Sequence, residues 1–390
     1  MTPELQQLID RAQHLYDDID LGSVHAWKAA GENRKAVGHM PIWVPRELVH
    51  AAGMLPVGIV GGGDRLEIIR GDAYFQSYIC RIPRSTIELA LSHRLDVLDG
   101  MLFPSICDVI RNLSGMWSML FPDRYVRYVD VPQNFDPAVG GTFWRFEMEQ
   151  LRADFARLSG RPISDDDLRH SIAVYNENRR AIRDLYAARS RRPWLFPFAE
   201  VYLFLRAGNV IPPEEHTAML RQYLELAPQD GERRDQDRSR VILVGMFCEQ
   251  PPHGLLVTVE RAGCWVVDDD LLLGLRWLQN EVSTEGDPMG NLVDAFLDHS
   301  APTASVYAPE GDRGRWVVDS VRRHDAEGVI FCAPSFCDPA LLEQPILVGA
   351  LDRAGIPHTE FKYAEDTGQF AVIREQAGTF SDSIRLWSEA

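Results

Sequence analysis

The sequence is organised around one stretch that occurs twice, as GMLFPSICD at residues 100–108 and as GVIFCAPSFCD at residues 328–338. In each copy, an apolar run is followed by Pro-Ser-X-Cys-Asp and then by a segment with helical periodicity. This pattern predicts a strand, a loop and a helix, with Cys107 and Cys337 at the starts of the two helices. The positive end of a helix dipole favours thiolate at such a position. Because thiolate is the form that binds metals, the two corners indicate a site that holds a ligand between them.

Strand and helix signals alternate around both copies of this stretch. Around the first copy, strands are expected at residues 37–44, 55–60, 97–103 and 125–131. Around the second copy, they are expected at residues 241–247, 265–268, 329–333 and 358–363. Strands that alternate with helices of about ten or more residues indicate parallel sheets with crossover helices. The chain is therefore predicted to be an α/β protein with two doubly wound, flavodoxin-like or Rossmann-like parallel-sheet domains joined by a helical segment.

The boundaries of these parts follow from changes in the pattern. An N-terminal helical segment is expected in residues 1–35, a first α/β domain in 36–141, a helical connector in 142–235 and a second α/β domain in 236–390. The connector is inferred because its residues show helical patterns punctuated by prolines, without a convincing strand. A run of charged residues at its end is typical of a surface linker.

Composition excludes several classes of protein. The chain has 390 residues, of which 45% are hydrophobic and 25% charged, and its formal net charge is −17. These values indicate a globular protein with more than one domain, and they argue against binding to nucleic acid or an anionic membrane. Six cysteines are too few for a secreted disulfide scaffold. With no recognisable signal peptide and no apolar run near about 18 residues, we expect a cytoplasmic protein that does not cross a membrane.

The cysteines are the main candidates for chemistry. Four of them are expected at or near the carboxyl ends of strands, where ligands bind to open parallel sheets: Cys80, which ends a predicted helical piece at residues 74–79, Cys107, Cys248 and Cys337. Cys264 and Cys332 are interpreted as small buried hydrophobic residues. There is no C-x-x-C pair, so a metal centre would need ligands from distant corners. The residue pattern alone leaves open whether these thiols hold such a centre or are ordinary buried side chains.

Two further positions are weak candidates for proton transfer, and the catalytic residues are otherwise unknown. His253 follows the strand at residues 241–247 and either donates a proton or caps a helix. Asp269 lies in an acidic triplet, residues 268–270, which is either a proton relay or metal site, or a solvated strand end that caps the next segment. The sequence contains neither a phosphate-binding loop nor a nucleophile elbow. It therefore predicts no P-loop binding of ATP by this chain.

Five further stretches of the sequence resemble those of a known protein family. They are MPIWVPRELVHAAGMLP at residues 40–56, YICR at 78–81, GMFCEQPP at 245–252, NEVST at 280–284 and IRLW at 384–387. Together with the two Pro-Ser-X-Cys-Asp corners, they resemble the 2-hydroxyacyl-CoA dehydratase and benzoyl-CoA reductase superfamily. The resemblance is closer to the smaller of the cluster-binding subunits of ATP-dependent (class I) benzoyl-CoA reductases, and it extends over nearly the whole chain.

This resemblance implies two α/β lobes with a [4Fe-4S] cluster between them. By motif, Cys80, Cys107 and Cys337 match the three cysteine ligands of the family. Cys248 is either a fourth ligand or a proton donor near the cluster, and Cys332 could replace Cys337 after a loop shift. Hydrogen bonds and burial around such thiolates tune the potential of the cluster.

The resemblance also implies partners and a reaction. A larger cluster-binding subunit and two ATPase or activator subunits would complete a heterotetramer, with ATP and magnesium only on the partner subunits. With ferredoxin as electron donor, this subunit would pass low-potential electrons for the reduction of benzoyl-CoA to a cyclic dienoyl-CoA. Two alternatives stay open: a subunit of a 2-hydroxyacyl-CoA dehydratase, which is a lyase, and a non-catalytic scaffold subunit. Which cluster-binding subunit holds benzoyl-CoA is not predicted.

Overall fold

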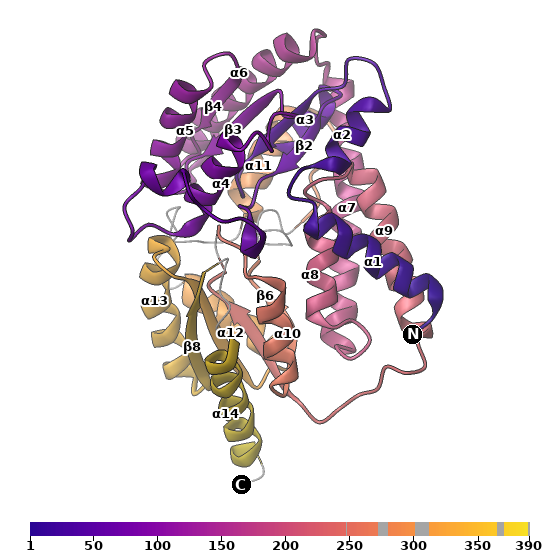
Figure 1. Cartoon of the computed structure of the whole chain (residues 1–390), viewed down its shortest axis with the longest axis vertical. Helices are drawn as coiled ribbons and strands as arrows, with labels where there is room; N and C mark the ends of the chain where they lie inside the picture. Colours follow the sequence, from indigo (N-terminus) through magenta and orange to yellow (C-terminus); the bar gives the residue numbers. More distant parts are fainter. Residues whose placement is uncertain (247, 272–279, 301–311, 365–369, 389–390) are drawn as a thin grey trace.

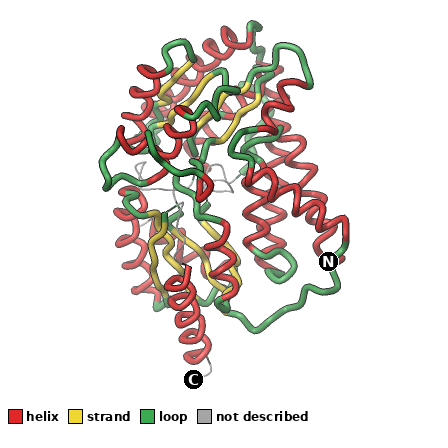
Figure 2. Tube along the Cα trace, in the orientation of Figure 1, coloured by secondary structure: helices red, strands yellow, loops and turns green. Residues whose placement is uncertain are grey.

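The computed structural model describes residues 1–246, 248–271, 280–300, 312–364 and 370–388. Two α/β lobes lie one above the other along the long axis of the molecule, and a group of helices packs beside them (Figures 1 and 2). In the described part of the chain, each lobe contains a four-stranded sheet whose strand pairs are all parallel. The predicted fold class is therefore confirmed.

The sheet of the first lobe has the strand order β2-β1-β3-β4. Its strands are β1 (Ala36–His39), β2 (Leu55–Gly58), β3 (Gly100–Pro104) and β4 (Tyr125–Val129). The crossover helices are α3 (Arg46–Ala51), α4 (Arg81–Leu91) and α5 (Asp108–Leu120), with the short turns η1 (Gly63–Arg65) and η2 (Gly71–Tyr74) before α4. From β1, the chain continues to β2 on one side and then to β3 on the other side of β1. The switch point of this sheet therefore lies between β1 and β3.

The sheet of the second lobe repeats this arrangement in the order β6-β5-β7-β8. Its strands are β5 (Ser239–Val244), β6 (Cys264–Asp269), β7 (Gly328–Pro334) and β8 (His358–Tyr363). The helices are α10 (His253–Arg261), α12 (Asp312–Arg323), α13 (Asp338–Ala354) and α14 (Phe370–Ser388). β3 and β7 therefore occupy equivalent central positions, and every residue of both strands is buried. Burial on both faces explains why the two strands read as continuous apolar runs.

The helical part joins the lobes. It consists of α6 (Thr142–Ser159), α7 (Asp165–Arg191), α8 (Phe198–Ala207) and α9 (Pro213–Leu226), joined by α1 (Pro3–Asp17) and α2 (Gly22–Ala29). Residues 142–226 are all described and contain no strand, as predicted. Ser164 and Asp167 start α7 with a capping box, in which each side chain accepts a hydrogen bond from the backbone N–H of the other residue. Helix α11 (Pro288–His299), which the sequence analysis missed, packs against α6 and α7.

Several predicted segments have other bounds in the structure or do not form. The strand expected at residues 37–44 stops at His39, because Pro41 cannot donate to a ladder and Ile42 and Trp43 have positive φ angles of 63° and 52°. The strand expected at residues 241–247 stops before Gly245, whose φ is 98°, and residue 247 lies outside the described residues. The helical piece expected at residues 74–79 is wrong, since a helix begins only after Cys80.

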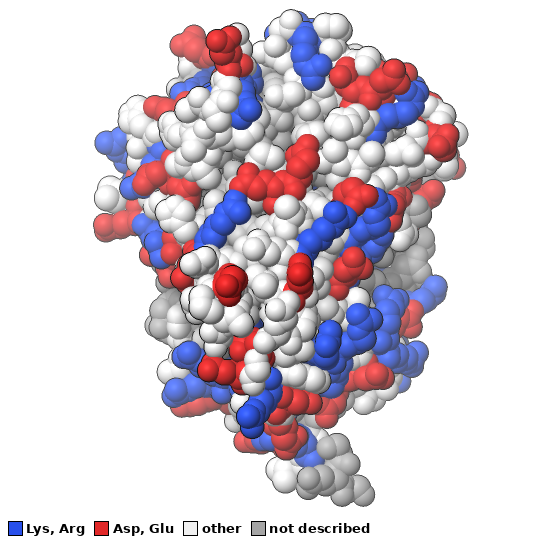
Figure 3. Space-filling model, turned by 90° about the vertical axis from the view of Figure 1, so that its right-hand side faces the viewer, with Lys and Arg blue, Asp and Glu red and all other residues white. Residues whose placement is uncertain are grey.

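The surface mixes both signs of charge. Figure 3 shows the side of the molecule that carries α1 and α7–α9 in Figure 1, and Lys and Arg are interspersed there with Asp and Glu. Among the residues that the structure describes, no helix combines the length and the apolar character that a membrane span needs.

Candidate functional site

Three of the predicted cysteines lie at helix N-termini. Cys80, Cys107 and Cys337 are the N-cap residues of α4, α5 and α13, respectively. The first corner follows the carboxyl end of β3, and the second follows the carboxyl end of β7, which has the equivalent position in the other sheet. This is the edge at which open parallel sheets bind ligands.

The two corners are also tethered in the same way. In the first lobe, the backbone N–H of Ser105 donates to the carbonyl oxygen of Val129 at the end of β4, at 2.9 Å. In the second lobe, the N–H of Ser335 donates to the carbonyl oxygen of Tyr363 at the end of β8, at 2.6 Å. The repeated sequence thus produces a repeated structure, in which the neighbouring strand fixes the loop that carries each cysteine.

Four cysteines line one pocket between the lobes, with a volume of about 480 Å³. They are Cys80, Cys107, Cys248 and Cys337. The remaining wall is mainly apolar, with Asp108, Asp338 and Arg313 as its charged members. Cys264 and Cys332 do not line this pocket and have no exposed surface, which agrees with their interpretation as buried hydrophobic residues.

Burial dominates the pKa values of two of these thiols. It raises the pKa of Cys337 to about 12, although the backbone N–H of Ala340 in the first turn of α13 acts in the opposite direction. It also raises the pKa of Cys107, against the N–H groups of Ile110 and Val109. The expected effect of the helix N-termini is therefore present but is outweighed by the loss of hydration. A positively charged metal centre would supply the stabilisation that thiolates need here.

The side chains at the pocket include the type of ligand that an iron–sulfur cluster takes. The described residues contain no group of three or more His, Cys, Asp or Glu side chains that could hold one metal ion. A single ion needs ligands that converge on one point, whereas a four-iron cluster offers a separate iron to each thiolate. Four thiols line the wall of the pocket between the two lobes, and thiolates are the ligands that iron–sulfur clusters take.

Asp269 does not line the cysteine pocket. Its carboxylate lies 2.7 Å from the guanidinium of Arg189 on α7 and accepts a hydrogen bond from the hydroxyl of Tyr186 at 2.9 Å. Arg189 has no exposed side-chain surface. This contact fastens the helical connector to the carboxyl end of β6.

Asp270 has a different structural task. It is 1% exposed and accepts hydrogen bonds from the backbone N–H groups of Gly245 at 2.7 Å and Met246 at 3.2 Å. It therefore fixes the loop that leads to Cys248. The solvation expected for this strand end is wrong for Asp269 and Asp270, which are buried acceptors. The expected cap is present, since Asp269 accepts a hydrogen bond from the backbone N–H of Leu271, just after the strand, at 2.9 Å.

His253 also lies away from the pocket. It is the first residue of α10, after the N-cap residue Pro252, so it does not cap the helix. Its Nε2 is 3.1 Å from the carbonyl oxygen of Ala199, its backbone N–H donates to the hydroxyl of Tyr16, and burial lowers its pKa. The catalytic roles considered for His253 and Asp269 remain predictions, and neither residue lines the cysteine pocket.

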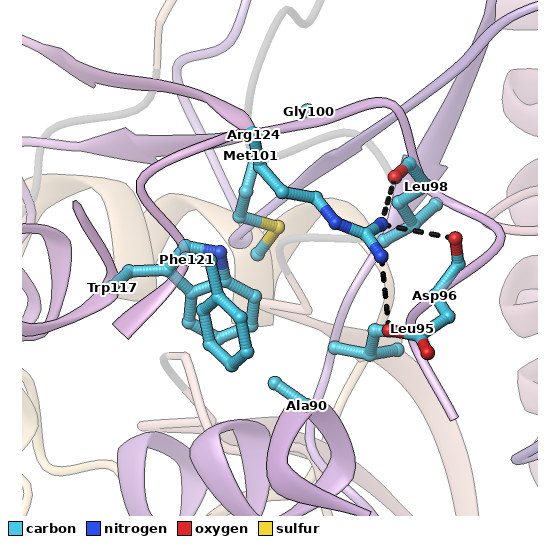
Figure 4. Close-up of a pocket in the computed structure, with 9 residues that line it drawn as sticks. All are labelled: Ala90, Leu95, Asp96, Leu98, Gly100, Met101, Trp117, Phe121 and Arg124. Atoms are coloured by element: carbon cyan, nitrogen blue, oxygen red, sulfur yellow. Dashed lines mark hydrogen bonds and ion pairs between the residues drawn. The ribbon is translucent and has the colours of Figure 1, made fainter. Parts of the chain in front are cut away.

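A second cavity, shown in Figure 4, lies at the opposite end of β3. Its volume of about 20 Å³ leaves room for roughly one water molecule. Arg124 closes it by donating hydrogen bonds to the backbone and carboxylate of Asp96, and the rest of the wall is apolar. This cavity is a packing gap between β3 and helices α4 and α5, at the opposite end of the sheet from the cysteines.

Two residues of the pocket region escaped the sequence analysis. Phe336 lies at the pocket with 53% exposure and a positive φ of 64°, a conformation that costs a non-glycine residue about 1–2 kcal/mol. The equivalent Ile106 of the first corner is buried, so the repeat offered no signal for it. Glu249 is 1% exposed and caps α4; the signal was an acidic residue inside the apolar stretch at 245–252.

Comparisons with known proteins find similar sequences over most of the chain. The sequence model of the family described as 2-hydroxyglutaryl-CoA dehydratase, D-component, matches residues 41–384. The chain is 57% identical to the C subunit of benzoyl-CoA reductase from Thauera aromatica, over 98% of this chain and 99% of that protein. It is 28% identical to the (R)-phenyllactyl-CoA dehydratase beta subunit of Clostridium sporogenes, over 90% of this chain and 92% of that protein. It is also 28% identical to the beta subunit of (R)-2-hydroxyglutaryl-CoA dehydratase from Acidaminococcus fermentans, over 92% and 94% of the two chains.

Proposed function

We propose that this chain, which belongs to the 2-hydroxyglutaryl-CoA dehydratase D-component family, is the iron–sulfur subunit of a benzoyl-CoA reductase. The pocket of four cysteines between the lobes carries this proposal. Cys80, Cys107 and Cys337 would hold a [4Fe-4S] cluster, with Cys248 beside them as a fourth ligand or a proton donor. When bound, the cluster would supply one-electron transfer at low potential for the reduction of the ring of benzoyl-CoA to a cyclic dienoyl-CoA.

The residues of the chain support this role through burial and charge. Helix N-termini direct backbone N–H groups toward the sulfur atoms of Cys107 and Cys337, and such hydrogen bonds tune cluster potentials. Asp108 and Asp338 at the same pocket add negative charge, which disfavours reduction and therefore lowers the potential. A low potential suits electrons that must enter an aromatic ring.

The proposal requires partners. Protein clusters reach potentials only down to about −700 mV, so coupling electron transfer to ATP hydrolysis makes physical sense. This sequence contains no phosphate-binding loop, which is consistent with ATP and magnesium on two ATPase or activator subunits. A larger cluster-binding subunit would complete the heterotetramer, and ferredoxin would supply the electrons.

A second function is supported by the family description and the 28% identical relatives, whose names are those of dehydratase beta subunits. A dehydratase would recycle one electron and remove water from a 2-hydroxyacyl-CoA without net reduction. The much higher identity to the reductase subunit, over nearly the whole chain, favours the reductase.

The two functions are separated by the reaction of the assembled complex. With ATP and a strong reductant, we expect stoichiometric loss of benzoyl-CoA and formation of a cyclic dienoyl-CoA, with ATP consumed in every turnover. The same complex should not dehydrate (R)-2-hydroxyglutaryl-CoA or (R)-phenyllactyl-CoA. Dehydration with catalytic reductant, and no reduction of benzoyl-CoA, would refute the reductase. Full activity with a chain that never contains iron would instead indicate a scaffold subunit.

A further inference from the structure

Glu249 connects the second lobe to the helix that begins after Cys80. Its carboxylate accepts hydrogen bonds from the backbone N–H groups of Arg81 at 2.8 Å and Ile82 at 3.4 Å, the first two residues of α4. Glu249 follows Cys248 in the loop between β5 and α10 and is 1% exposed. A buried carboxylate of one lobe thus caps a helix of the other lobe, beside two of the four thiols.

This cap compensates for an unusual N-cap residue. The N-cap side chain normally provides the oxygen that accepts an N–H group from the first turn of its helix. Cys80 makes no such hydrogen bond, and sulfur is a weak acceptor. Because Glu249 accepts two of the N–H groups that start α4, the helix can begin at a cysteine whose thiol lines the pocket.

The loop that carries Glu249 is held by two buried tyrosines. The hydroxyl of Tyr363, at the end of β8, donates to the carbonyl oxygen of Glu249 at 2.5 Å. The hydroxyl of Tyr202, on α8, donates to the carbonyl oxygen of Pro251 at 2.8 Å. Both tyrosines are fully buried, so their positions are set by the core. The carboxylate is therefore presented by a fixed loop, which is the arrangement expected of preorganised support around a ligand.

We propose that Glu249 is a positioning residue of the cysteine pocket, which caps α4, orients Cys80 and makes contact between the lobes a condition for assembling the full set of thiols. This inference rests on the proposed function only in taking the ligand to be an iron–sulfur cluster. It predicts that removing the carboxylate of Glu249 in the second lobe loosens the start of helix α4 in the first lobe. A carboxamide, which also has an oxygen acceptor, should preserve much of the cap.

The chain offers a matched control. Glu260, on α10, is also buried and accepts hydrogen bonds from the backbone N–H groups of Phe198 at 2.7 Å and Ala199 at 3.2 Å, at the start of α8. It therefore caps a helix with the same chemistry, but it does not line the cysteine pocket. Glu260→Ala removes a cap of the same type without touching any of the four thiols of the pocket.

The experiment uses the full chain, purified without oxygen, as wild type, E249A, E249Q and E260A. Hydrogen exchange of residues 81–91 should be about two- to thirtyfold faster in E249A, the range expected for a lost cap, and close to wild type in E249Q and E260A. If E249A does not fold, Glu249→Asp, which is too short to reach α4, should show the same faster exchange beside E249Q. Unchanged exchange in α4 would overturn the inference.

Cluster spectroscopy provides the second readout. After brief exposure to an iron chelator and one equivalent of ferricyanide, E249A should lose Fe²⁺ faster than E260A, because one thiolate is poorly held. Ferricyanide takes the electron that the remaining three-iron cluster gives up, so E249A should also show more of the paramagnetic signal of the oxidised three-iron cluster. Equal iron loss in E249A and E260A would refute the positioning role. If the wild-type chain binds no iron, the proposed function fails, and exchange in α4 still decides whether Glu249 acts as the cap between the lobes.

Discussion

The buried ion pair between Asp269 and Arg189 offers a quantitative test of the structural role assigned to Asp269. Asp269→Asn keeps the shape of the side chain and the acceptor that serves Tyr186, but it removes the negative charge 2.7 Å from a guanidinium with no exposed surface. Breaking a buried pair from one side costs about 3–5 kcal/mol. Asp268, 3.9 Å from the same guanidinium, should reduce the loss to about 3 kcal/mol, the lower end of that range.

The double variant makes the test sharper. Adding Arg189→Met removes the uncompensated charge, so the double variant should regain at least about 2 kcal/mol relative to Asp269→Asn alone. Urea unfolding followed by circular dichroism measures both values. Asp319→Asn, in an exposed pair with Arg322, is the control and should change stability by less than about 0.5 kcal/mol. If Asp269→Asn were as stable as wild type but lost activity in the assembled complex, the structural reasoning would be refuted and a catalytic role favoured.

Further predictions concern a thiol, a histidine and a glycine. Cys332→Ala should keep its iron, because this buried thiol does not line the pocket, whereas Cys337→Ala should lose it; equal iron analyses would contradict the assignment. Burial lowers the pKa of His216 to about 4, below the value of about 6.5 in an unfolded chain, so its neutral form stabilises the fold above about pH 6.5 and this contribution is lost as the pH falls toward 4. His216→Gln should therefore show a shallower loss of stability over this range in urea unfolding. Gly115→Ala, on the exposed face of α5 with no atom near the added carbon, should raise stability by about 1 kcal/mol, and a lower melting temperature would contradict this.

Much of the fold could be predicted because parallel strands have a strong local signal. The runs at residues 329–333 and 358–363 are apolar or alternating segments between turn residues, and they fall within β7 and β8. Helix α11 also had a signal that was overlooked, since Asp287 and Pro288 are a typical N-cap and first helical residue. Strand ends were less predictable, because Ile42 and Trp43 adopt positive φ angles that their side chains do not favour.

The site was predictable in parts but not as a whole. The repeated motif placed Cys107 and Cys337 at helix starts, which the structure confirms. The two corners are 230 residues apart in the sequence, and they line one pocket only because of the strand order and the packing of the lobes. Local periodicity predicts neither of these. The same limitation hid the cap that Glu249 provides, because its partners lie 167 and 168 residues away.

The central claim, that the pocket of cysteines holds a four-iron cluster, is tested most directly by iron and acid-labile sulfide analysis of the chain purified without oxygen. The wild-type chain should contain about four of each. Cys107→Ala should lose most of both, and Cys264→Ala, which alters a buried thiol outside the pocket, should keep them. Absence of iron from freshly prepared wild-type protein, or equal iron in the two variants, would contradict the claim.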